Sequence, residues 1–212
     1  MRSLCAGLFL AAALLPAQTL ETQNGFDTQF EVGPVTIVPR LRFRSLPEGS
    51  GFYQVRVGPE VFFEHTGRVR YIGGYFFEPE APDGIGPWLN FQRVFAAVDA
   101  AITQRRWGDF ETRTMFERFF EPQDDDFNRY RQRFRLMTDF RVSPFLGTEL
   151  FFRTRGLTQV RYTAGFRFHL RDDVILDVGA FYDARYLPGL DNRIIVFTTL
   201  SIRRIGRVDP DF

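Results

Sequence analysis

Arginines at every second position are the residues of this chain whose spacing says most about chemistry. They form the run Arg129-Tyr130-Arg131-Gln132-Arg133-Phe134-Arg135-Leu136. A planar guanidinium donates paired hydrogen bonds to carboxylates and other oxyanions, so such a row can hold a network of carboxylates or attract anions. Successive side chains of a β-strand point to opposite faces, so a strand here has one guanidinium face and one largely apolar face.

Nucleophilic catalysis is the second chemistry that the residue types allow. The chain has two histidines, His65 and His169, and a histidine beside a serine or a carboxylate can activate a nucleophile. Ser201 and Asp177 fall on the same predicted face as His169. We favour a structural role for His169 in an arginine–carboxylate network, and we expect no enzyme activity. No cofactor or metal motif is predicted, and the acidic stretch Asp124-Asp125-Asp126 is interpreted as a solvated loop.

The first residues predict a secretory signal peptide. Arg2 supplies a positive charge, an apolar run follows from Leu4 to Leu15, and Pro16-Ala17 offers a cleavage point. The run is too short to span a bilayer as a helix. We therefore expect residues 1–17 to be a cleaved signal and 18–212 to be a single domain. Cleavage removes Cys5, which leaves no cysteine and no thiolate chemistry.

The charge balance argues against nucleic acid as a partner. The chain has 27 basic residues, all of them arginine, against 26 acidic ones, for a net charge of +1. Arg2 is the only charged residue of the predicted signal, so the mature chain is neutral. Binding to nucleic acid generally needs a basic excess.

Ten segments alternate apolar and polar residues in the manner of β-strands. They are 27–44, 52–64, 67–78, 88–104, 109–120, 127–141, 145–153, 158–170, 173–185 and 192–203. The faces of 88–104 cannot be assigned, and this segment could contain a helical turn. The connections alternate between long and short, as in outer-membrane barrels, where short turns face the periplasm. We predict a closed antiparallel transmembrane β-barrel of about ten strands (range 8–12), with both chain ends in the periplasm.

The cost of exposing arginine to lipid decides which face is inside a membrane barrel. A lipid-facing arginine near the midplane costs ~2–4 kcal/mol, so turning Arg131, Arg133 and Arg135 outward would cost roughly 6–12 kcal/mol. The arginines are therefore predicted to face the lumen. The predicted location is the bacterial outer membrane, with outer-membrane lipid, lipopolysaccharide and the barrel assembly machinery as partners. A secreted soluble barrel that binds an apolar ligand is the alternative.

We expect an arginine–carboxylate network to fill the lumen, with a basic outer mouth where arginines outnumber carboxylates. The candidate members are Arg113, Glu117, Arg129, Arg131, Arg133, Arg135, Asp139, Glu149, Arg161, Arg167, Asp177 and Asp183. A barrel of about ten strands is closer to the packed eight-stranded barrels than to open channels of ~16 strands. A structural or interaction role is therefore favoured. Two alternatives stay open: a narrow channel selective for small anions, and an enzyme that modifies outer-leaflet lipid.

Two motifs in the middle of the chain resemble a known bacterial family. They are Arg113-Thr114-Met115-Phe116-Glu117-Arg118-Phe119 and, after an acidic loop, the arginine run that begins at Arg129. Trp88-Leu89-Asn90-Phe91-Gln92 is loosely similar to a further element of that family. The family is the outer-membrane barrel family known as domain of unknown function 2490, and the resemblance covers roughly residues 30–203. It implies a barrel in the outer membrane and no particular activity.

Overall fold

The computed structural model describes residues 19–46, 51–81, 86–105, 108–122, 125–187 and 191–207, the last four of these without their side chains. Within these ranges, no helix is long and apolar enough to cross a membrane. The predicted signal peptide, 1–17, lies outside the described residues, as does the C-terminal Phe212.

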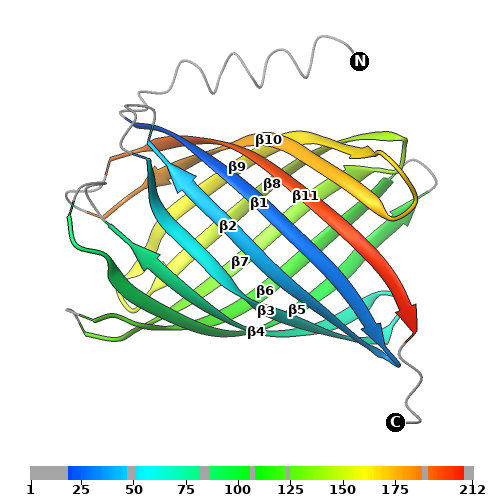
Figure 1. Ribbon diagram of the computed structural model, residues 1–212, viewed down its shortest axis with the longest axis horizontal. Helices are drawn as coiled ribbons and strands as arrows, with labels where there is room; N and C mark the ends of the chain where they lie inside the picture. The colour runs from blue at the N-terminus through cyan, green and yellow to red at the C-terminus, as the bar shows by residue number, and fades with distance from the viewer. Residues whose placement is uncertain are drawn as a thin grey trace.

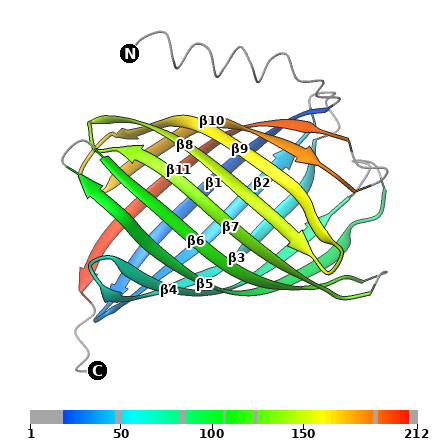
Figure 2. The same cartoon turned by 180° about the vertical axis from the view of Figure 1, so that it is seen from behind.

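Eleven strands form one closed barrel, which confirms the predicted all-β closed barrel and lies within the predicted range of strand number (Figures 1 and 2). The strands are β1 (Thr19–Val32), β2 (Val35–Ser45), β3 (Phe52–Thr66), β4 (Val69–Glu80), β5 (Leu89–Arg105), β6 (Gly108–Phe120), β7 (Phe127–Thr138), β8 (Val142–Arg153), β9 (Gly156–His169), β10 (Val174–Arg185) and β11 (Arg193–Arg207). Each strand pairs with its sequence neighbours, and β1 closes the ring against β11.

The predicted first segment, 27–44, is a hairpin rather than one strand. β1 pairs with β2 in antiparallel fashion, from Val32 opposite Val35 to Thr22 opposite Ser45. The turn between them begins at Gly33, whose φ of 58° suits glycine. A two-residue hairpin with glycine first and proline second is compatible with a type II′ turn. The turn reverses the inward parity, so odd residues face the lumen on β1 and even residues do so on β2.

The additional strand makes the closure parallel, which differs from the fully antiparallel barrel that we expected. β1 pairs with β11 in parallel, from Thr19 opposite Arg193 to Glu31 opposite Arg207. The two arrows run the same way in Figure 1. β1 therefore begins at the end that carries the long connections, and β11 ends at the end that carries the short turns. The expectation that both chain ends lie at the short-turn end holds for the last strand but not for the first.

The segment 88–104 is strand from Leu89 onward and contains no helical turn. As β5, it alternates buried Arg93, Phe95, Ala97 and Asp99 with exposed residues between them. The alternation is hard to recognise in the sequence because alanines lie on both faces of the strand, and alanine is found both in the lumen and on the outer wall. The segment therefore presents one arginine and one aspartate to the lumen.

Inward glycines make room for inward aromatic rings. A side chain at Gly74 would collide with the ring of Phe95, and one at Gly165 would collide with Phe145. Glycine within a barrel strand often marks bending or close packing, and these two positions show close packing. The rings of Phe76 and Phe95 stack at 5.5 Å inside the barrel.

Candidate functional site

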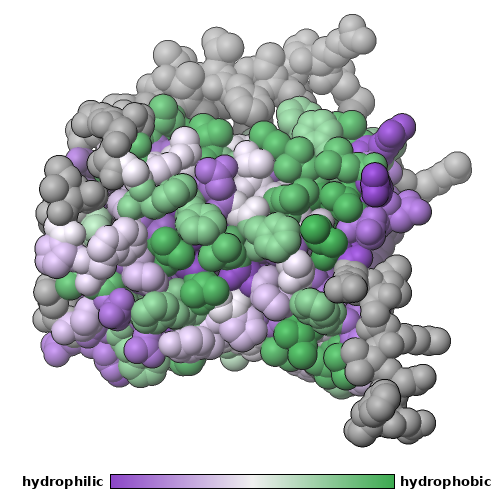
Figure 3. All heavy atoms as spheres, in the orientation of Figure 1, coloured by the Kyte–Doolittle hydropathy of each residue, from purple (hydrophilic) through white to green (hydrophobic). Residues whose placement is uncertain are grey.

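The barrel is charged inside and apolar outside. Glu117 and Asp183, which point inward, have no exposed surface at all. By contrast, the outward side chains of Phe116 and Tyr162 are 53% and 50% exposed. Apolar side chains are prominent on the wall seen in Figure 3. This arrangement is the reverse of a water-soluble protein, in which charges lie outside and apolar side chains inside.

Glu117 on β6 is the centre of the largest charge cluster in the lumen. Its carboxylate accepts hydrogen bonds from Arg93 at 2.8 Å, from Arg129 at 2.6 Å and from Arg131 at 2.9 Å. The register explains these contacts, because Phe95 and Arg129 lie directly opposite Glu117 on the two neighbouring strands. Three guanidiniums thus surround one fully buried carboxylate.

The cluster continues around the barrel in both directions. Arg93 also pairs with Glu78 on β4 at 3.0 Å. On the other side, Arg131 donates to Oε1 of Glu149 on β8 at 3.1 and 2.6 Å. Because each of these arginines bridges two carboxylates, the network ties together β4, β5, β6, β7 and β8.

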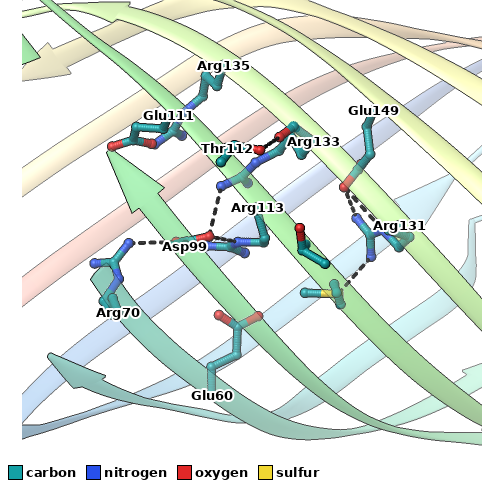
Figure 4. A network of polar contacts seen from close by, with 12 residues as sticks. Glu60, Arg70, Asp99, Glu111, Thr112, Arg113, Arg131, Arg133, Arg135 and Glu149 are labelled. Atoms are coloured by element: carbon teal, nitrogen blue, oxygen red, sulfur yellow. Dashed lines mark hydrogen bonds and ion pairs between the residues drawn. The ribbon is translucent and has the colours of Figure 1, made fainter. Parts of the chain in front are cut away.

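Asp99 on β5 is a second centre, nearer the short-turn end (Figure 4). Arg113 donates to both of its oxygens at 2.5 and 2.7 Å, and Arg70 donates to one of them at 2.9 Å. Arg133 makes an ion pair with Asp99 at 3.9 Å, which is beyond hydrogen-bond distance. Two residues further along β7, Arg135 pairs with Glu111 on β6 at 2.7 Å.

Bidentate pairs line the opposite wall. Arg161 donates to Asp183 at 2.6 and 2.9 Å, and Arg167 donates to Asp177 at 2.8 Å to each oxygen. The seam, where β1 closes the barrel against β11, also carries a charge contact: Arg193 on β11 donates to Glu21 on β1 at 2.8 Å. The parallel closure is therefore held by side chains as well as by its backbone ladder.

Aromatic rings inside the barrel complete the packing around the arginines. The guanidinium of Arg161 lies 4.0 Å from the centre of the Phe181 ring and 5.3 Å from that of Phe151. Arg129 and Arg131 also lie over Phe151, at 5.1 and 4.9 Å. Such cation–π contacts are stronger in desolvated surroundings. The interior is therefore a mixed layer of guanidiniums, carboxylates and phenyl rings.

Eleven of the twelve predicted network residues line the barrel interior. The exception is Asp139, which lies in the exposed connection between β7 and β8. The prediction extended the sixth segment to 141, whereas β7 ends at Thr138. The prediction also missed Arg93 and Asp99, since the faces of their segment were unassigned. It missed the inward phenylalanines because bulky apolar residues were all expected to face outward.

Three cavities follow one another along the lumen and share lining residues. The cavity near the long connections has a volume of about 280 Å³, the central one about 290 Å³, and the one near the short turns about 400 Å³. Each end cavity is lined by eight arginines, against three carboxylates at the long-connection end and four at the other. The excess of arginine thus runs along the whole lumen and is not confined to the predicted outer mouth.

The histidines lie away from these clusters. His65 packs its ring against Tyr71 at 5.7 Å near the short turn between β3 and β4. His169 is the last residue of β9, also at the short-turn end, and it lines a surface hollow with Asp139 and Arg171. Within the described ranges, no group of three or more histidines, cysteines and carboxylates could hold a metal ion.

The comparisons with known proteins give one assignment. No curated protein matches the chain in sequence. The model of the family that the central motifs resemble does match, over residues 26–193, which is most of the chain and runs from β1 to the start of β11. The matched region includes both charge centres, Asp99 and Glu117. The chain therefore belongs to the family described as Protein of unknown function (DUF2490).

Proposed function

We propose that this protein is a transmembrane β-barrel of the bacterial outer membrane, exported with a cleaved signal peptide. The observation that carries the proposal is the inside-out distribution of charge. In water, the exposed aromatic and aliphatic side chains of the outer wall would form an apolar surface far larger than the few hundred Å² usual for a soluble monomer. In a bilayer, the same surface is matched by lipid, and the arginines are kept from it.

An outward polar cluster is compatible with lipid because its groups satisfy one another. The side-chain amide of Gln132 donates to the hydroxyl of Thr112, and its carbonyl accepts from Thr114 at 2.7 Å and Tyr130 at 3.0 Å. The Thr112 hydroxyl in turn donates to the backbone carbonyl of Arg133 at 3.1 Å. Polar groups that are hydrogen-bonded in this way lose little on transfer to an apolar medium.

We further propose that the lumen is plugged and that the role is structural or one of interaction, without catalysis. The support comes from Glu117, Asp183 and their arginines, which form bonded networks along the inner wall, with phenyl rings packed against them. A plug of this kind stiffens the wall. The arginine-lined cavities favour a narrow anion-selective path as the second candidate.

Location is tested by fractionation of the native host cells. We expect the mature protein in the outer membrane, resistant to extraction by alkaline carbonate, and migrating differently on a gel before and after boiling. Recovery in the soluble fraction, without a heat-dependent shift, would refute the membrane assignment.

Conduction is tested separately in planar lipid bilayers with the refolded full chain. A plugged lumen predicts no discrete current steps at ±100 mV in 1 M KCl. Discrete steps with a reversal potential that indicates anion selectivity would refute the plugged lumen and support the anion channel. They would not affect the proposed location.

A further inference from the structure

We propose that the lumen holds a binding site for a small oxyanion of the phosphate or sulfate type, at the junction between two cavities that we call the basic waist. The waist is defined by the five arginines that line both the central cavity and the cavity near the short turns: Arg40, Arg42, Arg113, Arg133 and Arg135. Thr199, Phe197 and Asp177 complete the shared lining. The inference concerns the lumen alone and does not require that the barrel conducts.

The carboxylates near the waist are already engaged. Asp177 is held on both oxygens by Arg167 at 2.8 Å. Asp27 is held on both oxygens by Arg42 at 2.5 and 2.9 Å, and Arg40 reaches Glu60 at 2.8 Å. Asp177 and Asp27 are therefore engaged on both oxygens, and Glu60 is engaged by Arg40 on one.

Arg133 lacks a carboxylate at hydrogen-bond distance from its guanidinium within the described part of the chain. The closest ion pair of its guanidinium within the described part of the chain is with Asp99, at 3.9 Å. Asp99 already accepts two hydrogen bonds from Arg113 and one from Arg70. Glu149 stands directly opposite Arg133 on β8, yet its hydrogen bonds go to Arg131. In Figure 4 the long contact to Asp99 is the one dashed line that reaches the guanidinium of Arg133, whereas its backbone carbonyl accepts a hydrogen bond from Thr112.

The neighbours of Arg133 make its position unfavourable without a further anion. Arg113 lies directly opposite it on β6, and Arg131 and Arg135 flank it on the same face of β7. Like charges opposite each other on adjacent strands are destabilising. The ion pairs join Asp99 to three arginines, Arg70, Arg113 and Arg133. By contrast, Arg40 and Arg42 are balanced by Asp27 and Glu60, and Arg135 by Glu111. Three guanidiniums thus share the single carboxylate of Asp99, and an oxyanion beside Arg133 would offset this local excess of positive charge.

The shape of the site also suits an oxyanion. A guanidinium presents a planar fork that fits two oxygens of a phosphate, sulfate or carboxylate. The cavities on either side of the waist measure about 290 and 400 Å³, which is ample for a tetrahedral anion and its remaining water. The Thr199 hydroxyl provides a neutral donor on the same lining.

The experiment measures binding of inorganic phosphate to the refolded full chain in a zwitterionic detergent by titration calorimetry, in chloride-free buffer of constant ionic strength. We expect saturable binding of one phosphate per barrel, with competition by sulfate. Arg133→Gln should weaken the affinity at least tenfold. The matched control is Arg118→Gln, which removes the same charge from a side chain on the outer wall bonded to Asp126. It should bind phosphate as the original chain does.

Folding of each variant is checked by its heat-dependent gel migration. Arg133→Gln should fold, because it breaks no ion pair shorter than 3.9 Å. Arg133→Lys provides a second test, since it keeps the charge without the planar fork and should bind phosphate with an intermediate affinity. Absence of saturable binding to the original chain would overturn the proposal. So would equal affinities of Arg133→Gln and Arg118→Gln.

Discussion

Replacing Glu117 by glutamine should cost more stability than neutralising any other single carboxylate of the lumen network. The glutamine has nearly the same shape, so the change removes charge and little volume. Three guanidiniums lie within 2.6 to 2.9 Å of the carboxylate, and the side chain has no exposed surface. Removing one partner of a buried ion pair costs about 3–5 kcal/mol, because the remaining charge is left uncompensated.

The measurement is equilibrium unfolding in urea of the protein refolded into detergent micelles, followed by tryptophan fluorescence. With an m value of about 2–3 kcal/mol/M, the expected loss lowers the midpoint by roughly 1–2.5 M. The matched control is Glu111→Gln. Glu111 also pairs with one arginine of the ladder, Arg135, but both side chains are about a quarter exposed. Such a pair contributes ~0–1 kcal/mol, so the control should shift the midpoint by less than about 0.5 M.

A double variant tests whether the uncompensated charge is the cause. Adding Arg129→Gln to Glu117→Gln removes one of the stranded guanidiniums, so the double variant should lose less stability than the two single losses added together. Equal midpoint shifts for Glu117→Gln and Glu111→Gln would show that burial does not set the strength of these pairs. Strict additivity in the double variant would refute the coupling between Glu117 and Arg129.

Three further expectations follow from the packing and the topology. Gly74→Val should prevent folding or strongly destabilise the barrel because the new side chain meets the Phe95 ring, and Phe95→Ala in the same chain should recover folding, as heat-dependent gel migration would report. Cysteines placed at Thr22 and Val196, which are partners across the seam, should form a disulfide on mild oxidation, whereas failure to cross-link would argue against the parallel register. Tyr53→Phe removes a 2.6 Å hydrogen bond to the buried carboxylate of Glu21 and should cost about 1.5–3 kcal/mol in urea unfolding; an unchanged midpoint would contradict this.

Much of the fold was predictable because alternation in a strand is a local property. Inward and outward residues of β7 follow from the sequence of that strand alone, and the structure places its four arginines inward. β1 was harder to recognise, since its outward face carries Thr22, Asn24 and Thr28 between the apolar residues. At Gly33 the inward positions change from odd to even residue numbers. The hairpin of β1 and β2 was therefore interpreted as a single strand. Closure is not local, and one additional strand is enough to change it from antiparallel to parallel.

The members of the lumen network were predictable, but their partners were not. Arg131 and Arg133 are two residues apart on the same face and look alike in the sequence. Arg131 has two carboxylates, Glu117 and Glu149, within hydrogen-bond distance, although neither lies directly opposite it. Arg133 lies directly opposite Arg113 and Glu149, yet Arg113 bonds Asp99 and Glu149 bonds Arg131. Alternation determines which way a side chain points, whereas the diagonal reach of each guanidinium determines which carboxylate it bonds. The guanidinium left without a short contact is that of Arg133, and it is there that a small anion would complete the network.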